Sequence, residues 1–149
     1  MPRSFDQILR ELEMLRAEDF DYKRSNASGL ERLDELTEEL LMLPQPERAI
    51  PALYAVMERM PEADLGSPGA LVHTLEKFRG SYENELSESI KRKPTPLAVW
   101  MLNRILNGIR TPDQKRPYLD LMRSVLKHSQ ALDSTKQEAQ HFLQRQERI

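Results

Sequence analysis

The chain has 149 residues, of which 39% are hydrophobic and 31% charged, and its formal net charge at pH 7 is −2. The absence of cysteine excludes disulfides, thiolate zinc sites and cysteine nucleophiles. No apolar run reaches the roughly 20 residues that a membrane-spanning helix needs. We therefore expect one helical domain over 1–149, made of an N-terminal helix and loop (1–27) and stacked helix pairs (28–146).

The first residues, Met1-Pro2-Arg3-Ser4-Phe5-Asp6, lack the apolar segment of a secretory signal. A chain without cysteine is also compatible with a reducing compartment. These two features predict a cytoplasmic protein.

The first predicted helix runs from about Ser4 to Ala17, because Ser4 and Gln7 have the spacing of a capping box. The polar stretch 18–27 that follows is predicted to be a loop.

The second predicted helix begins at Ser28, where Glu31 again gives capping-box spacing, and it ends at Pro44. Leucines recur along it at a helical period. This apolar stripe comprises Leu30, Leu33, Leu36, Leu40 and Leu43. A third helix is expected over 47–60, with Pro51 either absorbed in its first turn or kinking it there.

The run Leu65-Gly66-Ser67-Pro68-Gly69 predicts a turn followed by a helix start. Gly66 permits a sharp backbone bend, and Ser67 can cap the free amides of the next helix. Pro68 suits the first helical position, where no intrahelical amide bond is lost. A fourth helix is therefore expected over 68–79, before Gly80.

Four more helices are predicted in the second half of the chain. Thr95-Pro96 and Thr111-Pro112 repeat the combination of a capping residue and a proline. In the helix that follows Thr95, the period places Leu97, Met101 and Ile105 on the inward face. The four predicted ranges are 81–92, 96–108, 112–128 and 134–146.

No segment has the alternating apolar pattern of a strand, so the sequence predicts an all-α fold. Connections of about two to six residues make neighbouring helices antiparallel. About seven or eight helices of this kind form either a short HEAT-like solenoid of stacked pairs or a compact bundle.

The charge is unevenly distributed along the chain. Residues 1–75 hold 8 basic and 15 acidic residues, and residues 76–149 hold 14 and 9, so the two parts carry −7 and +5. Five acids lie three or four residues apart in the second helix, where like charges destabilise an isolated helix. Such a strip would attract a basic partner. We take these acids as candidate partner-binding residues: Glu31, Asp34, Glu35, Glu38 and Glu39.

The basic residues of the second half offer an alternative function, a helical-repeat protein that binds nucleic acid or acts as an adaptor. No aromatic residues interleave with these basic residues, and the cations that end a helix also complement its dipole. The residues concerned are Lys91, Arg92, Lys93, Arg110, Lys115 and Arg116.

An enzymatic function has one candidate pair. His73 and Glu76 are three residues apart, as a general base and its orienting carboxylate could be, although a structural hydrogen bond has the same spacing. No motif has metal-ligand or phosphate-binding spacing. We therefore expect no enzymatic activity, no catalytic residue, no metal and no cofactor.

Trp100, Asn103 and Asn107 share one stripe of the helix predicted over 96–108, with Arg104 beside them. Indole, amide and guanidinium groups together are typical of an interface hot spot. The alternative is structural: Asn103 and Arg104 bond loop carbonyls, while Trp100 fills a second packing face.

Two runs carry a resemblance to a family: Ala63-Asp64-Leu65-Gly66-Ser67-Pro68-Gly69 with Leu71-Val72-His73 and Leu75-Glu76, and Arg92-Lys93-Pro94-Thr95-Pro96 with Trp100 to Asn107. Over roughly residues 30–145 the chain resembles the HEAT-like helical immunity proteins of bacterial polymorphic toxin systems, of the Rhs and contact-dependent growth inhibition types.

The resemblance implies a cytoplasmic bacterial protein without enzymatic activity that binds one cognate toxin domain and occludes its active site or substrate groove. Such toxins are often nucleases or other nucleic-acid-directed enzymes, whose basic clefts would suit an acidic strip. It implies that the chain binds neither a membrane nor, directly, a nucleic acid.

Overall fold

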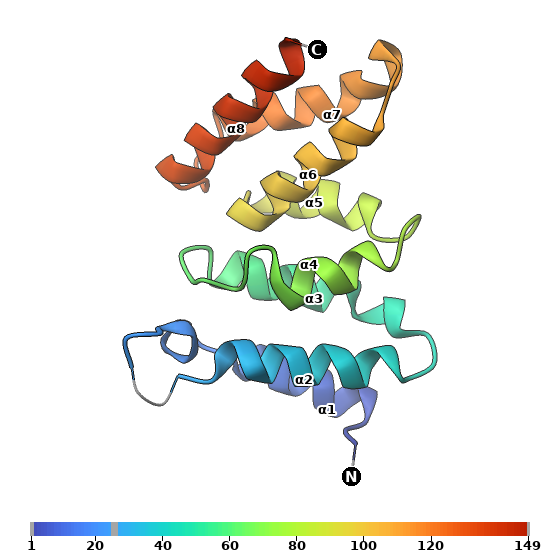
Figure 1. Cartoon of the computed structure of the whole chain (residues 1–149), viewed down its shortest axis with the longest axis vertical. Helices are drawn as coiled ribbons and strands as arrows, with labels where there is room; N and C mark the ends of the chain where they lie inside the picture. Colours follow the sequence, from blue (N-terminus) through green and yellow to red (C-terminus); the bar gives the residue numbers. More distant parts are fainter. Residues whose placement is uncertain (1, 25–26, 149) are drawn as a thin grey trace. The chain divides into compact units, whose positions relative to one another are not determined.

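The computed structural model describes residues 2–24 and 27–148, and within them the chain forms eight α-helices, two short 3-10 helices and no strand (Figure 1). The all-α prediction is confirmed. None of the helices in these ranges combines the length and apolar character of a membrane span. The elements are α1 (Phe5–Met14), η1 (Ala17–Phe20), α2 (Gly29–Leu41), η2 (Pro46–Ala49), α3 (Ile50–Arg59), α4 (Gly69–Glu76), α5 (Glu83–Arg92), α6 (Pro96–Gly108), α7 (Pro112–Val125) and α8 (Asp133–Glu147).

The chain divides into two compact units, Met1–Glu85 and Leu86–Ile149. The first unit holds α1 to α4 and the second holds α6 to α8, with α5 beginning just before the division. A single domain over 1–149 stays a prediction.

In the first unit, α1 runs antiparallel to α2 and parallel to α3. Arg3, just before α1, contacts Glu39 near the end of α2. At the other end of α1, Arg59 of α3 donates a hydrogen bond to the carbonyl of Leu15 at 3.3 Å. Because α4 packs against both α2 and α3, the unit has two layers, α1 with α3 and α2 with α4.

The core of the first unit consists of apolar side chains from all four helices. In α2, Leu33, Leu36 and Leu40 are fully buried. Leu30 was predicted to belong to the same apolar stripe, but it is 45% exposed and is not part of the core. Full burial of one leucine stabilises the fold by about 1.5–3 kcal/mol. The other helices contribute Ile8, Leu12, Leu53, Tyr54, Met57, Leu71, Val72 and Leu75.

The second unit has the same kind of packing among α6, α7 and α8, which all contact one another. Gln146 at the end of α8 bonds Asn107 near the end of α6, so these two helices run parallel. Lys115 near the start of α7 also contacts Gln146, so α7 runs antiparallel to α8. The buried face of α6 comprises Ala98, Val99, Met101, Leu102 and Leu106. The predicted inward positions Leu97 and Ile105 are only partly buried.

Three of the predicted caps are present. Ser4 accepts from the amide of Gln7, whose side chain accepts from the amide of Ser4 in return. Thr95 and Thr111 accept at 3.3 Å from the amides of Ala98 and Gln114. The range 96–108 is confirmed without change for α6.

The capping box predicted at Ser28 is wrong. Ser28 makes no side-chain cap bond, and its ψ of 18° is not the extended conformation of a capping residue. The start of α2 packs against η1, a short helix in the stretch for which the sequence predicts a loop. A Cβ at Gly29 would lie 2.7 Å from the buried ring of Phe20, so only glycine allows this close packing.

The cap predicted at Ser67 is also wrong, although α4 begins one residue from the predicted start at 68. Gly66 bends the chain with a φ of +118°, as expected, but Gly69 is left-handed too, with a φ of +86°. The turn therefore continues past Pro68, whose peptide bond with Ser67 is cis. The helix begins at Gly69, and its first turn has no side-chain cap.

The first and third predicted helices also differ from the observed elements. The predicted first helix ends at Met14, because Leu15 is extended and buried against the core. The third predicted helix is divided between η2 and α3, and Pro51 lies in the first turn of α3.

Candidate protein-binding face

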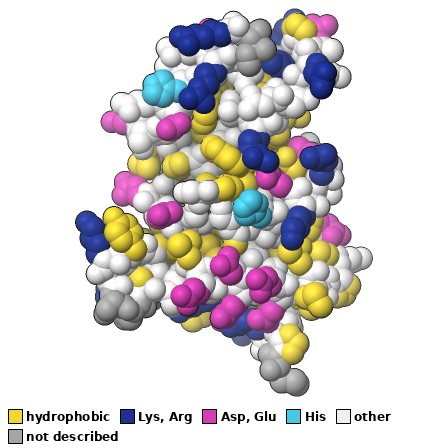
Figure 2. Space-filling view, in the orientation of Figure 1, with side chains coloured by type: hydrophobic (Ala, Val, Ile, Leu, Met, Phe, Trp, Pro, Cys, Tyr) yellow, Lys and Arg dark blue, Asp and Glu magenta, His cyan; other side chains and the backbone are white. Residues whose placement is uncertain are grey.

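The acidic strip of α2 lies on the side of the helix opposite its buried leucines. Figure 2 shows a group of acidic side chains gathered over this helix. Glu31, Asp34, Glu35 and Glu38 are exposed, and Glu39 is half-buried. Like charges at this spacing disfavour the helix by a few tenths of a kcal/mol per pair. Burial of the leucine face exceeds that cost and holds the carboxylates together.

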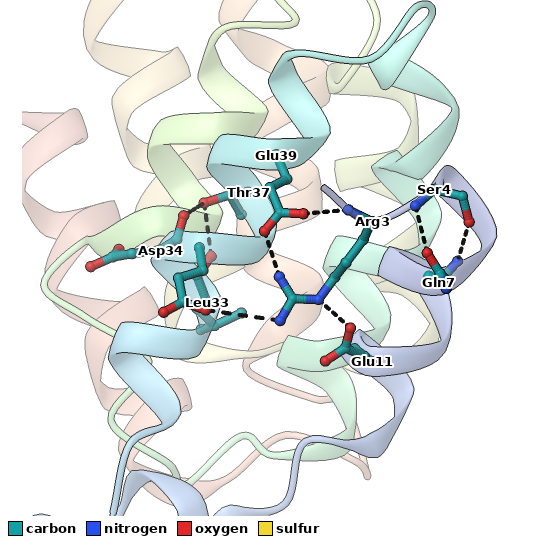
Figure 3. Close-up of polar contacts among 9 residues, drawn as sticks. Arg3, Ser4, Gln7, Glu11, Leu33, Asp34, Thr37 and Glu39 are labelled. Carbon is teal, nitrogen blue, oxygen red and sulfur yellow. Dashed lines mark hydrogen bonds and ion pairs between the residues drawn. The ribbon is translucent and has the colours of Figure 1, made fainter. Parts of the chain in front are cut away.

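One end of the strip is neutralised within the first unit by Arg3 (Figure 3). The amide of Arg3 donates to Glu39 at 2.7 Å, and its guanidinium contacts Glu39 and Glu11. Glu35 lies 3.9 Å from the same guanidinium. The hydrogen bond to Glu11 raises the pKa of Arg3 above its usual value, so the guanidinium stays charged. Glu39 therefore serves the contact between α1 and α2.

The rest of the strip is not neutralised in this way. Among the described residues, no ion pair is recorded for Glu31, Asp34 or Glu38. Arg32, on the same helix, lies 3.9 Å from Asp19 of η1 rather than beside these acids. The five predicted residues thus fall into two sets, with Glu31, Asp34 and Glu38 accessible and Glu35 and Glu39 turned toward Arg3.

A groove beside η1 was missed by sequence analysis. It has a volume of about 760 Å³ and lies where α1 and α3 end, lined by Met14, Arg16, Asp19, Arg59 and Met60 among others. Phe20 was the available signal, because an aromatic residue in a polar stretch indicates that the stretch packs against the core. Phe20 is 6% exposed.

Asn103 and Asn107, on the same stripe of α6 as Trp100, accept hydrogen bonds within the second unit. The Gln146 amide donates to Asn103 at 3.0 Å and to Asn107 at 2.8 Å, and its oxygen accepts from Lys115 at 3.3 Å. The side-chain oxygen of Asn103 thus accepts from α8. The predicted bonds of Asn103 and Arg104 to loop carbonyls stay predictions. Arg104 lies over the Trp100 ring, 4.8 Å from its centre.

The basic residues of the second unit are partly paired with acids on their own helices. Lys91 lies 3.6 Å from Glu88, and Arg116 lies 3.0 Å from Asp113. Such exposed pairs three residues apart are worth a few tenths of a kcal/mol. They lower the positive charge that these positions present to a polyanion.

The three histidines lie on different elements: His73 is on α4, His128 follows α7 and His141 is on α8. His73 is exposed on α4, and its partner in the predicted pair, Glu76, is half-buried. His128 bonds the carbonyl of Lys91 at 2.7 Å through Nε2 and accepts from the amide of Gln130 through Nδ1. Within residues 2–24 and 27–148, no group of three acids or histidines is placed to hold a metal ion.

No family model, curated protein or solved structure matches this chain.

Proposed function

We propose that this chain is a protein-binding module without catalytic activity that neutralises a cognate bacterial toxin domain. The sequence resemblance supports this class of function, and the exposed acidic face of α2 supports a basic binding surface on the toxin. The proposed mechanism is occlusion of the active site or substrate groove. A cleft that binds phosphates is positively charged, and it would attract this face.

The observation that best supports this proposal is that the side chains of Glu31, Asp34 and Glu38 are accessible to a partner. The three carboxylates lie on one exposed face of a helix whose other side is anchored by leucines. Among the described residues, none of the three has an ion pair. Charges of this kind act mainly on the rate of association, and their effect decreases as salt increases.

The test is co-expression with the product of the adjacent upstream gene, followed by association kinetics at several salt concentrations. The wild-type chain should restore growth and co-purify with that product. Glu38→Lys should slow association roughly two- to fivefold at low salt, and the triple reversal of Glu31, Asp34 and Glu38 should slow it by about tenfold or more.

The matched control is Glu138→Lys, which makes the same charge change at an exposed position of α8. It should leave association unchanged. Equal effects of Glu38→Lys and Glu138→Lys would place the contact elsewhere than on α2. A neighbouring product that is not toxic and does not bind would contradict the proposed function.

Nucleic-acid binding is the competing result. A salt-dependent filter-binding measurement with a defined duplex would detect it, and substitutions at Lys93 and Arg110 should then reduce affinity. Under the proposed function the chain does not retain the duplex at physiological salt.

A further inference from the structure

A second hollow adjoins the groove beside η1, and residues of that short helix line both. The first hollow, of about 760 Å³, lies between the ends of α1 and α3. The second hollow, of about 360 Å³, is lined by Phe20, Tyr22, Glu62 and Asp64 among others. Ala17, which is exposed, lines both hollows. Together they form a concave surface within the first unit.

Two large hydrophobic side chains are exposed on this surface. Met14 is 64% exposed in the first hollow, and Tyr22 is 82% exposed in the second. Tyrosine and methionine are enriched where proteins contact each other, because they offer a large contact area. Met14 precedes η1 in the chain and Tyr22 follows it, which favours a partner segment that contacts both hollows.

The cations of the first hollow are engaged within the molecule. Arg59 donates to the carbonyls of Leu12 at 2.8 Å and Leu15 at 3.3 Å, and it thereby balances the negative end of the α1 dipole. Arg32 lies 3.9 Å from Asp19, and Arg16 lies 3.9 Å from Glu18. Their positive charges are thus balanced locally.

Two of the acids that line the hollows have no cation in the described part of the chain close enough to form an ion pair. Glu13 lines the first hollow and Glu62 the second, and both are exposed. No ion pair is recorded for either among the described residues. The second hollow also has one cation, Lys23, but the two hollows together are lined by six acids and four bases. The net charge that the surface offers to an occupant is therefore negative, beside apolar walls made by Met14 and Met60.

We propose that this groove receives a loop of the partner protein in which a lysine or arginine stands next to an apolar residue. The long aliphatic stem of the cation would pack on the methionines, and its charged end would reach Glu13 or Glu62. This inference rests on the proposed function and adds a second contact to it. Arg32 of α2 lines the groove, so the groove adjoins the acidic face on the same helix.

The test uses two defined peptides with blocked ends, Gly-Leu-Arg-Leu-Gly and Gly-Leu-Glu-Leu-Gly, titrated to millimolar concentration against the full chain with labelled methionine and alanine methyl groups. The arginine peptide should shift the signals of Met14, Ala17 and Met60, whereas the buried Met122 of the second unit should not move. The glutamate peptide should shift none of them.

A charge-swap variant makes the test specific. In the Glu13→Lys/Glu62→Lys variant the preference should reverse, so that the glutamate peptide shifts the three methyl groups and the arginine peptide does not. Both substitutions are at exposed positions, and Glu138→Lys serves as the control that keeps the wild-type preference. Equal shifts with both peptides, or none at the three methyl groups, would overturn the inference.

The same variant separates this inference from the proposed function. If the wild-type chain binds the neighbouring toxin, Glu13→Lys/Glu62→Lys should lower the affinity by about tenfold. Unchanged affinity would remove the groove from the interface and leave the function standing. A wild-type chain that binds no toxin would instead contradict the function itself, while the peptide titration still decides what the groove accepts.

Discussion

The side-chain amide of Gln146 donates a hydrogen bond to the side-chain oxygen of Asn103 at 3.0 Å, across 43 residues of sequence. The same amide bonds Asn107, and its oxygen accepts from Lys115, so one glutamine connects α6, α7 and α8. Each polar group of this side chain has a partner, which makes its position in a nearly buried site favourable.

Gln146→Ala should lower the free energy of unfolding by about 1–3 kcal/mol, because it leaves the buried Asn103 side chain without its partner. Chemical denaturation followed by circular dichroism measures the change. The exposed neighbour Gln144 provides the control, and Gln144→Ala should change stability by no more than about 0.5 kcal/mol. Equal effects of the two substitutions would mean that the bonds of Gln146 contribute nothing beyond its position in the helix.

Arg59→Ala should destabilise the protein by roughly 1–3 kcal/mol, because the carbonyls of Leu12 and Leu15 lose a charged donor. Arg59→Lys should recover only part of the loss, since one ammonium reaches both carbonyls less well than a planar guanidinium. Thermal unfolding of the three proteins tests this order. Arg59→Lys as damaging as Arg59→Ala would indicate that the guanidinium geometry is essential, and a neutral Arg59→Ala would contradict the role given to this residue.

Thr111→Ala should destabilise the protein by about 0.5–2 kcal/mol, because it removes the acceptor for the Gln114 amide at the start of α7. Ser28→Ala should have a much smaller effect, since Ser28 makes no side-chain cap bond at the start of α2. The two variants are compared by urea denaturation under identical conditions. A larger loss for Ser28→Ala would show that a cap forms at α2 after all.

Burial raises the pKa of Tyr54 above its ordinary value of 10.0, with smaller contributions from Tyr82 and nearby glutamates. The folded protein therefore keeps this proton at a pH where the unfolded chain loses it. The stability that follows is complete below about pH 10 and is lost as the pH rises above that value. Tyr54→Phe should reduce the alkaline loss of stability.

The pH profile of unfolding, measured from neutral to alkaline pH, tests the prediction for Tyr54. At neutral pH, Tyr54→Phe should cost about 0.5–1.5 kcal/mol or less, because the bond to the Tyr82 carbonyl is long, at 3.4 Å. Tyr22 is 82% exposed, so Tyr22→Phe should leave the alkaline profile as in the wild type. An unchanged profile in Tyr54→Phe would assign the alkaline transition to other groups.

The acidic strip shows how far local reasoning reaches. The spacing of Glu31, Asp34 and Glu38 correctly predicted an exposed face, because side chains three and four residues apart share one side of a helix. It could not predict that Arg3 would neutralise Glu39, since the two residues are 36 positions apart and meet only when α1 packs on α2. The interface role of this face stays a prediction.

The sequence by itself determined that the chain is helical and where most helices lie, because leucine periodicity, threonine caps and prolines act within one or two turns. Thr95 and Pro96 fixed the start of α6 in this way. Only the tertiary structure decided that Ser28 is uncapped, that η1 packs on Gly29, and that Gln146 bonds Asn103. Those features depend on the burial of groups distant in sequence, whose free energy is gained only after the helices have packed.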